Sequence, residues 1–240
     1  MPGNKPIHNK PQIVLVSHGD RGDASDDVLR DARLKSLQKQ LQARFSECQL
    51  SAVTISDDGA LSEALRANPH AIVVSLLFSK GYFFTQKIAS IAAQASDSAI
   101  ILSPFVENAA LARLVADAAG GKDILLVGHG SGKSDASANA TRALALLIEQ
   151  VSSSNVICGF LEQSPYAVDL ASQAQASGTK MHVMGLFLEA GLHGGEDFES
   201  ITRAAGDACC GASIIGDHYG LADLLETEIK RSLEHWASVD

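Results

Sequence analysis

The sequence has little of several features that mark particular classes of protein. Aromatic residues make up 5% of the 240 residues, with a single tryptophan, so a base-stacking surface for nucleic acid is not expected. The four cysteines have no C-x-x-C spacing, which argues against a zinc knuckle or a disulfide framework. The longest apolar runs, such as Ala71–Phe78, are far shorter than the roughly 18 residues that span a bilayer. We therefore expect a globular, cytoplasmic protein with neither nucleic acid nor membrane as a partner.

Positive charge is scarce in the second half of the chain. Residues 1–120 carry 12 Lys and Arg against 12 Asp and Glu, whereas residues 121–240 carry 7 against 16. The whole formal charge of −9 therefore lies in the second half. Nucleic-acid binding requires a basic face, whereas an acidic half suits a cation as partner. The alternative is an ordinary acidic surface that keeps the protein in solution.

The chain contains an internal repeat of about 110 residues. Three pairs of segments match in the same order and at nearly one offset: 13–20 (IVLVSHGD) with 124–131 (ILLVGHGS), 72–81 with 182–191, and 99–103 with 213–217. The first pair aligns His18 with His129. We infer two copies of one unit, an N-terminal lobe of residues 1–120 and a C-terminal lobe of residues 121–240.

Each copy alternates short apolar runs with longer amphipathic ones, which predicts strands followed by helices. The expected strands are 12–16, 51–55, 71–78 and 99–102 in the first copy, and 123–127, 155–160, 181–188 and 212–215 in the second. In the second copy the expected helices are 136–151, 166–176, 197–208 and 221–236. This pattern predicts an α/β protein with two flavodoxin-like lobes. Each lobe would be a parallel sheet of about four strands with helices on both faces, and a cleft would separate the two lobes.

The loops after the strands are where such sheets bind ligands. The segment 128–134 (GHGSGKS) is similar to a phosphate-binding loop, but it is one residue short, and its repeat partner lacks Gly-Lys. Ser131 comes one place too late for the serine of a nucleophile elbow. A phosphatase with a histidine nucleophile would have Arg before His-Gly, where this chain has Ser17 and Gly128.

Three possible metal ligands follow predicted strands of the second copy: His129, Glu162 and His193. Imidazole and carboxylate bind borderline divalent ions, and three such ligands leave coordination positions open. A single histidine is more often structural, and Glu162 could simply complement a helix N-terminus. The joint placement favours a metal site.

Three motifs of the second half resemble those of the class II tetrapyrrole chelatases, in particular the CbiX/SirB-like sirohydrochlorin chelatases in their long, tandem form. The motifs are 126–132 (LVGHGSG), 159–165 (GFLEQSP) and 186–193 (LFLEAGLH). The resemblance implies ATP-independent insertion of a divalent metal, Co²⁺, Fe²⁺ or Ni²⁺, into sirohydrochlorin or a related tetrapyrrole, in cobalamin or siroheme biosynthesis. It assigns metal binding and proton acceptance to His129, Glu162 and His193, since metallation displaces two pyrrole protons.

The first half departs from this pattern. Phe83 stands where the second half has His193, and only Ser56, Asp57 and Asp58 lie near the position of Glu162. We therefore expect one active site on the second lobe, with the first lobe as its opposite wall, although in some tandem relatives the first lobe is the active one. The residues expected to contact the substrate are His18, Tyr82, Phe83 and Ser131.

Two alternatives stay open at this point. The chain could bind a metal or a tetrapyrrole as a carrier without turnover, or it could be another metal-assisted enzyme on a similar fold. It could be a monomer or a homodimer. A substrate with many carboxylates would need local basic groups, for which the candidates near the site loops are Arg21, Lys80, Lys87, Lys133 and Arg142.

Overall fold

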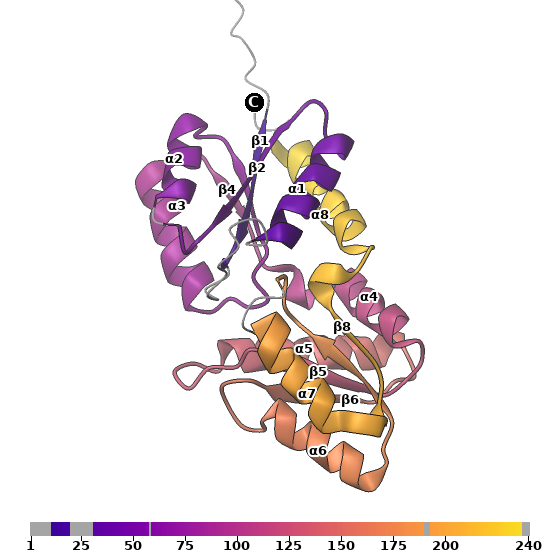
Figure 1. Cartoon of the computed structure of the whole chain (residues 1–240). Coiled ribbons are helices and arrows are strands. Elements are labelled where there is room, and N and C mark those ends of the chain that lie inside the picture. Colours follow the sequence, from indigo (N-terminus) through magenta and orange to yellow (C-terminus); the bar gives the residue numbers. More distant parts are fainter. Residues whose placement is uncertain (1–10, 20–30, 58, 190–192, 237–240) are drawn as a thin grey trace, which may run out of the picture.

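The computed structural model describes residues 11–19, 31–57, 59–189 and 193–236. They form two lobes, each built on a parallel four-stranded sheet (Figure 1). The first sheet has the order β2-β1-β3-β4, with the strands β1 (Gln12–Ser17), β2 (Gln49–Thr54), β3 (Ile72–Ser75) and β4 (Ile100–Leu102). The second has the equivalent order β6-β5-β7-β8, with the strands β5 (Ile124–Gly128), β6 (Val156–Phe160), β7 (Met181–Gly185) and β8 (Cys209–Ile214). The predicted α/β fold with two similar lobes is confirmed.

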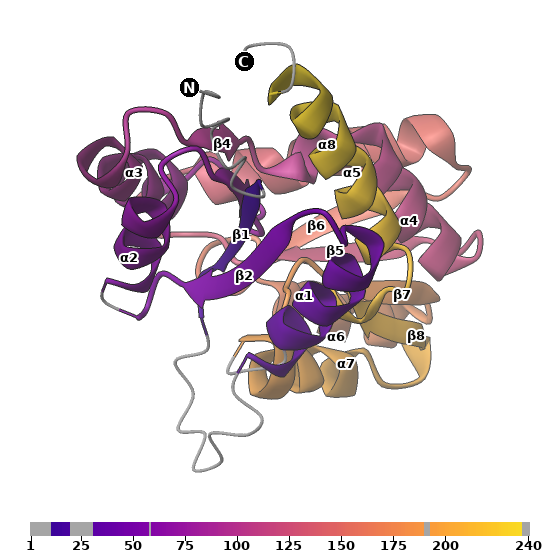
Figure 2. The ribbon, with the colours of Figure 1, turned by 90° about the horizontal axis from the view of Figure 1, so that it is seen from above.

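Helices cover both faces of each sheet (Figure 2). On the outer faces lie α2 (Ala60–Ala67) and α3 (Ala89–Ala95) in the first lobe, and α6 (Ala167–Ser177) and α7 (Phe198–Ala205) in the second. The inner faces are covered by α1 (Ala32–Arg44), α4 (Ala109–Ala119), α5 (Ala136–Val151) and α8 (Leu221–Trp236).

The strands β1, β3, β5 and β7 are buried on both faces, which explains their continuous apolar sequences. In β1, Ile13 and Leu15 belong to the inner core, whereas Val14 and Val16 pack with the outer helices of the first lobe. The central strand β5 repeats this alternation, with Leu126 directed inward and Val127 outward. Because side chains alternate along a strand, each sheet contributes to two separate hydrophobic layers, one on each of its faces.

The last helix of each repeat packs against the other lobe. Helix α4 ends the first repeat but lies against α5 and β7 of the second sheet, and α8 ends the second repeat but packs against α1 and β3 of the first (Figure 1). One hydrophobic core consequently contains buried side chains of both lobes, including Leu15, Leu34, Leu126 and Leu225. The two lobes are joined by a shared core rather than by a linker.

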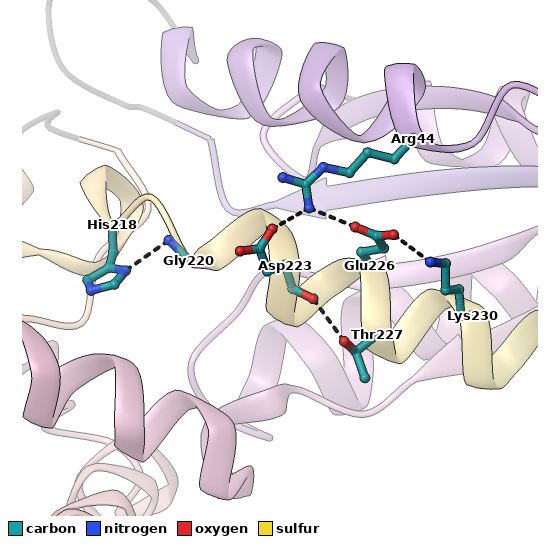
Figure 3. A network of polar contacts seen from close by, with 7 residues as sticks. All are labelled: Arg44, His218, Gly220, Asp223, Glu226, Thr227 and Lys230. Atoms are coloured by element: carbon teal, nitrogen blue, oxygen red, sulfur yellow. Dashed lines mark hydrogen bonds and ion pairs between the residues drawn. The ribbon is translucent and has the colours of Figure 1, made fainter.

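Charged groups reinforce this junction at its solvent edge. Arg44, in the last turn of α1, lies 2.5 Å from Asp223 and 2.8 Å from Glu226 of α8, and Lys230 extends the network from Glu226 (Figure 3). These groups are largely exposed, so each ion pair contributes little by itself. They connect α8 to the last turn of α1.

The predicted element boundaries differ most from the structure in three strands and one helix. The strands expected over 71–78 and 181–188 end at Ser75 and Gly185, although their continuations 76–78 and 186–188 remain mostly buried and apolar. Burial that continues beyond the end of each strand explains why the sequence pattern overestimated the length of both strands. The helix expected over 197–208 ends at Ala205, before Gly206 with φ +47°, and β8 begins at Cys209 rather than at residue 212.

In the described part of the chain, no helix has the length and hydrophobicity to cross a membrane.

Candidate functional site at the facing edges of the two sheets

The carboxyl edges of the two sheets face each other. The loop after β7 reaches the first turn of α1 in the other lobe, where the Glu189 carboxylate accepts a hydrogen bond from the backbone N–H of Leu34. The loop after β3 approaches the first turn of α5 in a corresponding way: a Cβ at Gly81 would lie 3.9 Å from that of Ala136. Helix N-termini and strand ends share one edge of such a sheet, so the two ligand-binding edges lie opposite each other.

His129 is located on this edge, directly after β5. Its side chain is 41% exposed, and its Nδ1 lies 2.9 Å from the carbonyl oxygen of Gly130. Because a carbonyl only accepts hydrogen bonds, this contact places the ring proton on Nδ1. In the neutral imidazole, Nε2 is then the nitrogen that can bind a metal ion or accept a proton.

Glu162 lies beside His129 because β6 pairs with β5. The Glu162 N–H donates a hydrogen bond of 3.0 Å to the carbonyl oxygen of His129, and its carboxylate Oε2 lies 3.8 Å from His129 Nδ1. The Glu162 side chain is about half exposed. A carboxylate near the N–H of an imidazole is the usual support for a metal-binding histidine. The structure thus brings together two of the three predicted ligands.

The third predicted ligand, His193, begins the short π-helix η3 (His193–Asp197), but its side chain lies outside the described residues, as do residues 190–192. In the part of the chain that the structure describes, no group of three or more His, Cys, Asp or Glu side chains is arranged to hold a metal ion. The three-residue metal site therefore stays a prediction.

The backbone of the loop that follows His129 is held by three side chains, one of its own and two from neighbouring elements. Gly130 N–H donates to Ser137 Oγ at 3.2 Å, Ser131 N–H to Gln163 Oε1 at 2.7 Å, and Lys133 N–H to Ser131 Oγ at 3.1 Å. Gly130 has φ +74°, and a Cβ there would come within 2.9 Å of Gln163 Cγ. Gln163 was not among the predicted site residues, although its position directly after Glu162 was a signal in the sequence.

In the first lobe, His18 has the same backbone contact as His129. Its Nδ1 lies 3.1 Å from the carbonyl oxygen of Gly19, and its ring meets that of Phe83 edge-on with centroids 4.3 Å apart. Phe83 begins the π-helix η1 (Phe83–Ile88), and Tyr82, 59% exposed, packs against it. The first lobe therefore has an aromatic ring, Phe83, at the position that His193 occupies in the second lobe.

The predicted basic residues differ in their surroundings. Lys80 lies 3.9 Å from Glu107, and the Arg142 guanidinium lies 5.2 Å from the centre of the Phe160 ring. Lys87 and Lys133 are exposed. Arg21 lies outside the described residues. Nothing in these contacts selects one cation for a substrate carboxylate.

Two further histidines have structural roles. His182 is 8% exposed and its Nε2 lies 2.8 Å from Ser213 Oγ; burial lowers the pKa of its imidazole. His218 Nδ1 accepts a hydrogen bond of 3.0 Å from Gly220 N–H just before α8 (Figure 3). Burial lowers the pKa of His218 as well, with Asp117 opposing the shift.

Comparison with known proteins agrees with this architecture. The family model CbiX matches residues 123–232. A solved structure described as CbiX, the terminal enzyme for biosynthesis of siroheme in denitrifying bacteria, shares 22% sequence identity and a TM-score of 0.74, over 92% of this chain and 98% of that one. SirB from Bacillus subtilis with Fe³⁺ shares 16% identity and a TM-score of 0.72, over 92% of this chain and 95% of the other. No curated protein matches the sequence significantly. The CbiX family model thus matches the second lobe, and the whole chain has the same two-lobed fold as the solved CbiX and SirB structures.

Proposed function

We propose that this protein inserts a divalent metal ion into sirohydrochlorin or a related tetrapyrrole without ATP. The observation that carries the proposal is the pairing of His129 with Glu162 on the edge of the CbiX domain that faces the first lobe. In this proposal the metal ion is a substrate, held before transfer by His129, Glu162 and His193. The first lobe forms the opposite wall, with Phe83 and Tyr82 against the macrocycle.

The reaction requires a base as well as a metal ligand. The macrocycle loses two pyrrole protons as its nitrogens bind the metal ion, and no electron is transferred. With its proton on Nδ1, the neutral His129 ring offers Nε2 toward an ion or a pyrrole N–H. Glu162, half exposed beside the ring, can attract the cation and pass a released proton to solvent.

The repeat supports a position for His193 beside His129. The π-helices η1 and η3 begin at equivalent residues, Phe83 and His193. In the first lobe, Phe83 contacts His18, the equivalent of His129. The same arrangement in the second lobe would place two imidazoles next to Glu162 and give one donor set for a borderline divalent ion.

The loop after His129 supports an ATP-independent reaction. A phosphate-binding loop directs its backbone N–H groups at the nucleotide. Here the N–H groups of Gly130, Ser131 and Lys133 already donate to side chains of the protein, so they are not presented together to a phosphate.

The test follows tetrapyrrole absorbance after mixing the purified protein with sirohydrochlorin and Fe²⁺, Co²⁺ or Ni²⁺ in turn, with the protein-free rate subtracted. We expect catalysed metallation, with Fe²⁺ pointing to siroheme biosynthesis and Co²⁺ to cobalamin biosynthesis. His129→Ala, His193→Ala and Glu162→Gln should each lower kcat, the histidine variants by about 10². Binding of tetrapyrrole without metallation by any of the three ions would instead identify a carrier.

Glu199→Gln provides a matched control. Glu199 is an exposed carboxylate on α7 of the same lobe, outside the proposed site. This variant removes the same charge as Glu162→Gln and should keep the wild-type rate. Equal losses in both variants would show that the general acidity of the lobe, rather than Glu162, matters.

A further inference from the structure

The segment that leads from β7 to His193 is attached to both lobes. Leu186 N–H donates to the carbonyl oxygen of Val127 at 2.9 Å, and Gly216 N–H donates to that of Phe187 at 3.0 Å. Two hydrogen bonds thus hold residues 186–187 to the second lobe. Glu189 follows directly, four residues before His193, and its carboxylate turns to the first lobe.

Glu189 caps the N-terminus of α1 across the lobe junction. Its Oε1 accepts the N–H of Leu34 at 2.7 Å and its Oε2 the N–H of Arg33 at 3.2 Å. These N–H groups belong to the second and third residues of the helix, which have no partner within it. Asp31, the residue before α1, makes no capping bond with its side chain and has φ +55°. The role that a local Asp or Ser usually fills is therefore filled by a residue 155 positions away.

The electrostatics of this contact suit a carboxylate. Negative charge is favourable at a helix N-terminus, and the Arg33 guanidinium lies nearby. Burial raises the pKa of Glu189, although the two N–H donors oppose this shift. The two N–H donors and Arg33 offset part of the cost of burying this carboxylate, whereas Asp31 adds to that cost.

Among the residues that the structure describes, the loop after β3 makes no equivalent contact with α5. Ser79 occupies the position that corresponds to Glu189, in the loop that passes α5 near Ala136. At the first turn of α5, Ala136 N–H is instead bonded to Ser134 Oγ within the same loop. The carboxylate is therefore present only on the loop that leads to the predicted histidine ligand.

We propose that Glu189 is a positioning residue, which holds the loop that carries His193 at a fixed distance from the first-lobe wall. In the sequence, α1 is the helix that follows His18, and Glu189 precedes His193 by four residues. The Glu189 carboxylate therefore joins the segment after His18 to the segment before His193. This role rests on the proposed chelatase function only in its effect on catalysis. The coupling between the two segments is a property of the fold and can be measured separately.

The experiment compares Glu189→Ala and Glu189→Gln with Asp217→Asn. Asp217 forms an ion pair with the Arg33 side chain at 2.5 Å, so Asp217→Asn weakens a lobe contact at the same turn of α1 without removing the backbone cap. Amide hydrogen exchange is followed in peptides that cover residues 31–36 and 193–198. We expect Glu189→Ala to speed exchange in both peptides. Glu189→Gln should keep part of the protection, because its amide oxygen still accepts a hydrogen bond. Asp217→Asn should leave exchange in 193–198 unchanged.

Catalysis gives the second measurement. Displacing a catalytic group by about 1 Å can cost 10²-fold in rate, so we expect Glu189→Ala to lower kcat for metallation 10- to 100-fold while Asp217→Asn changes it less than about 3-fold. Unchanged exchange in 193–198 would overturn the proposal whether or not the protein is a chelatase. Faster exchange with unaltered kcat in an active enzyme would reduce Glu189 to a structural cap and overturn it too. An inactive wild-type protein would refute the proposed function alone, and the exchange data would still decide on the coupling.

Discussion

Leu225→Ala tests whether the two lobes fold as one unit. Leu225 lies on α8, is fully buried, and belongs to the core that contains side chains of both lobes. Replacing a fully buried Leu by Ala removes its transfer free energy and leaves a cavity, which together destabilise a protein by about 2.7–5.0 kcal/mol. For a chain of this length, a loss of about 3 kcal/mol lowers Tm by roughly 6–12 °C.

The assay is differential scanning calorimetry of the wild type and the variant. We expect one cooperative transition in both, displaced to lower temperature in Leu225→Ala. The control is Leu146→Ala on α5, because Leu146 is 61% exposed and its truncation should change stability by no more than about 0.5 kcal/mol. Two separate transitions, of which Leu225→Ala moves only one, would refute a core shared by both lobes.

Three further outcomes can be measured. If Phe83 and His18 form the first-lobe wall as proposed, Phe83→Ala and His18→Ala should each raise KM for the tetrapyrrole more than they lower kcat, because a wall contacts the ground and transition states alike. Loss of turnover in His18→Ala with retention in His129→Ala would instead assign the active lobe to the first half. The pKa of His182 is lowered in the folded protein, so the unfolded state binds more protons below pH ~6.5 and the free energy of unfolding should fall as pH drops from there. Urea titrations at pH 7.5 and 5.5 should show a smaller loss of this free energy in His182→Gln than in the wild type, and an equal loss would exclude His182 as the cause. Gly216→Ala should destabilise the protein by about 1–3 kcal/mol or more, because its Cβ would overlap the backbone carbonyl of Leu188; a wild-type Tm would contradict the close approach of these two segments.

Much of this protein could be predicted from local pattern alone. Continuous apolar runs and helical periodicity are properties of neighbouring residues, and they predicted all eight strands, with α5 and α8 at their observed bounds. The repeat predicted that the two lobes are built alike, and the positions of His129 and Glu162 after predicted strands indicated that they lie at neighbouring strand ends. Residues 186–188 show the limit of this reasoning, since they are buried like a strand but lie beyond the end of β7.

The relation between the lobes was decided by tertiary structure. The repeat boundary assigns α4 to the first lobe and α8 to the second, yet each helix packs on the other lobe, because a helix with an apolar face buries it wherever the complementary surface lies. The cap of α1 by Glu189 could not be predicted from the sequence. A capping residue is expected next to its helix, whereas the actual partner is 155 positions away. Sequence alone thus determined the two lobes and the residue types at their strand ends. Only the packing of the chain determined how the lobes face each other, because contacts between distant residues have no local pattern to predict them.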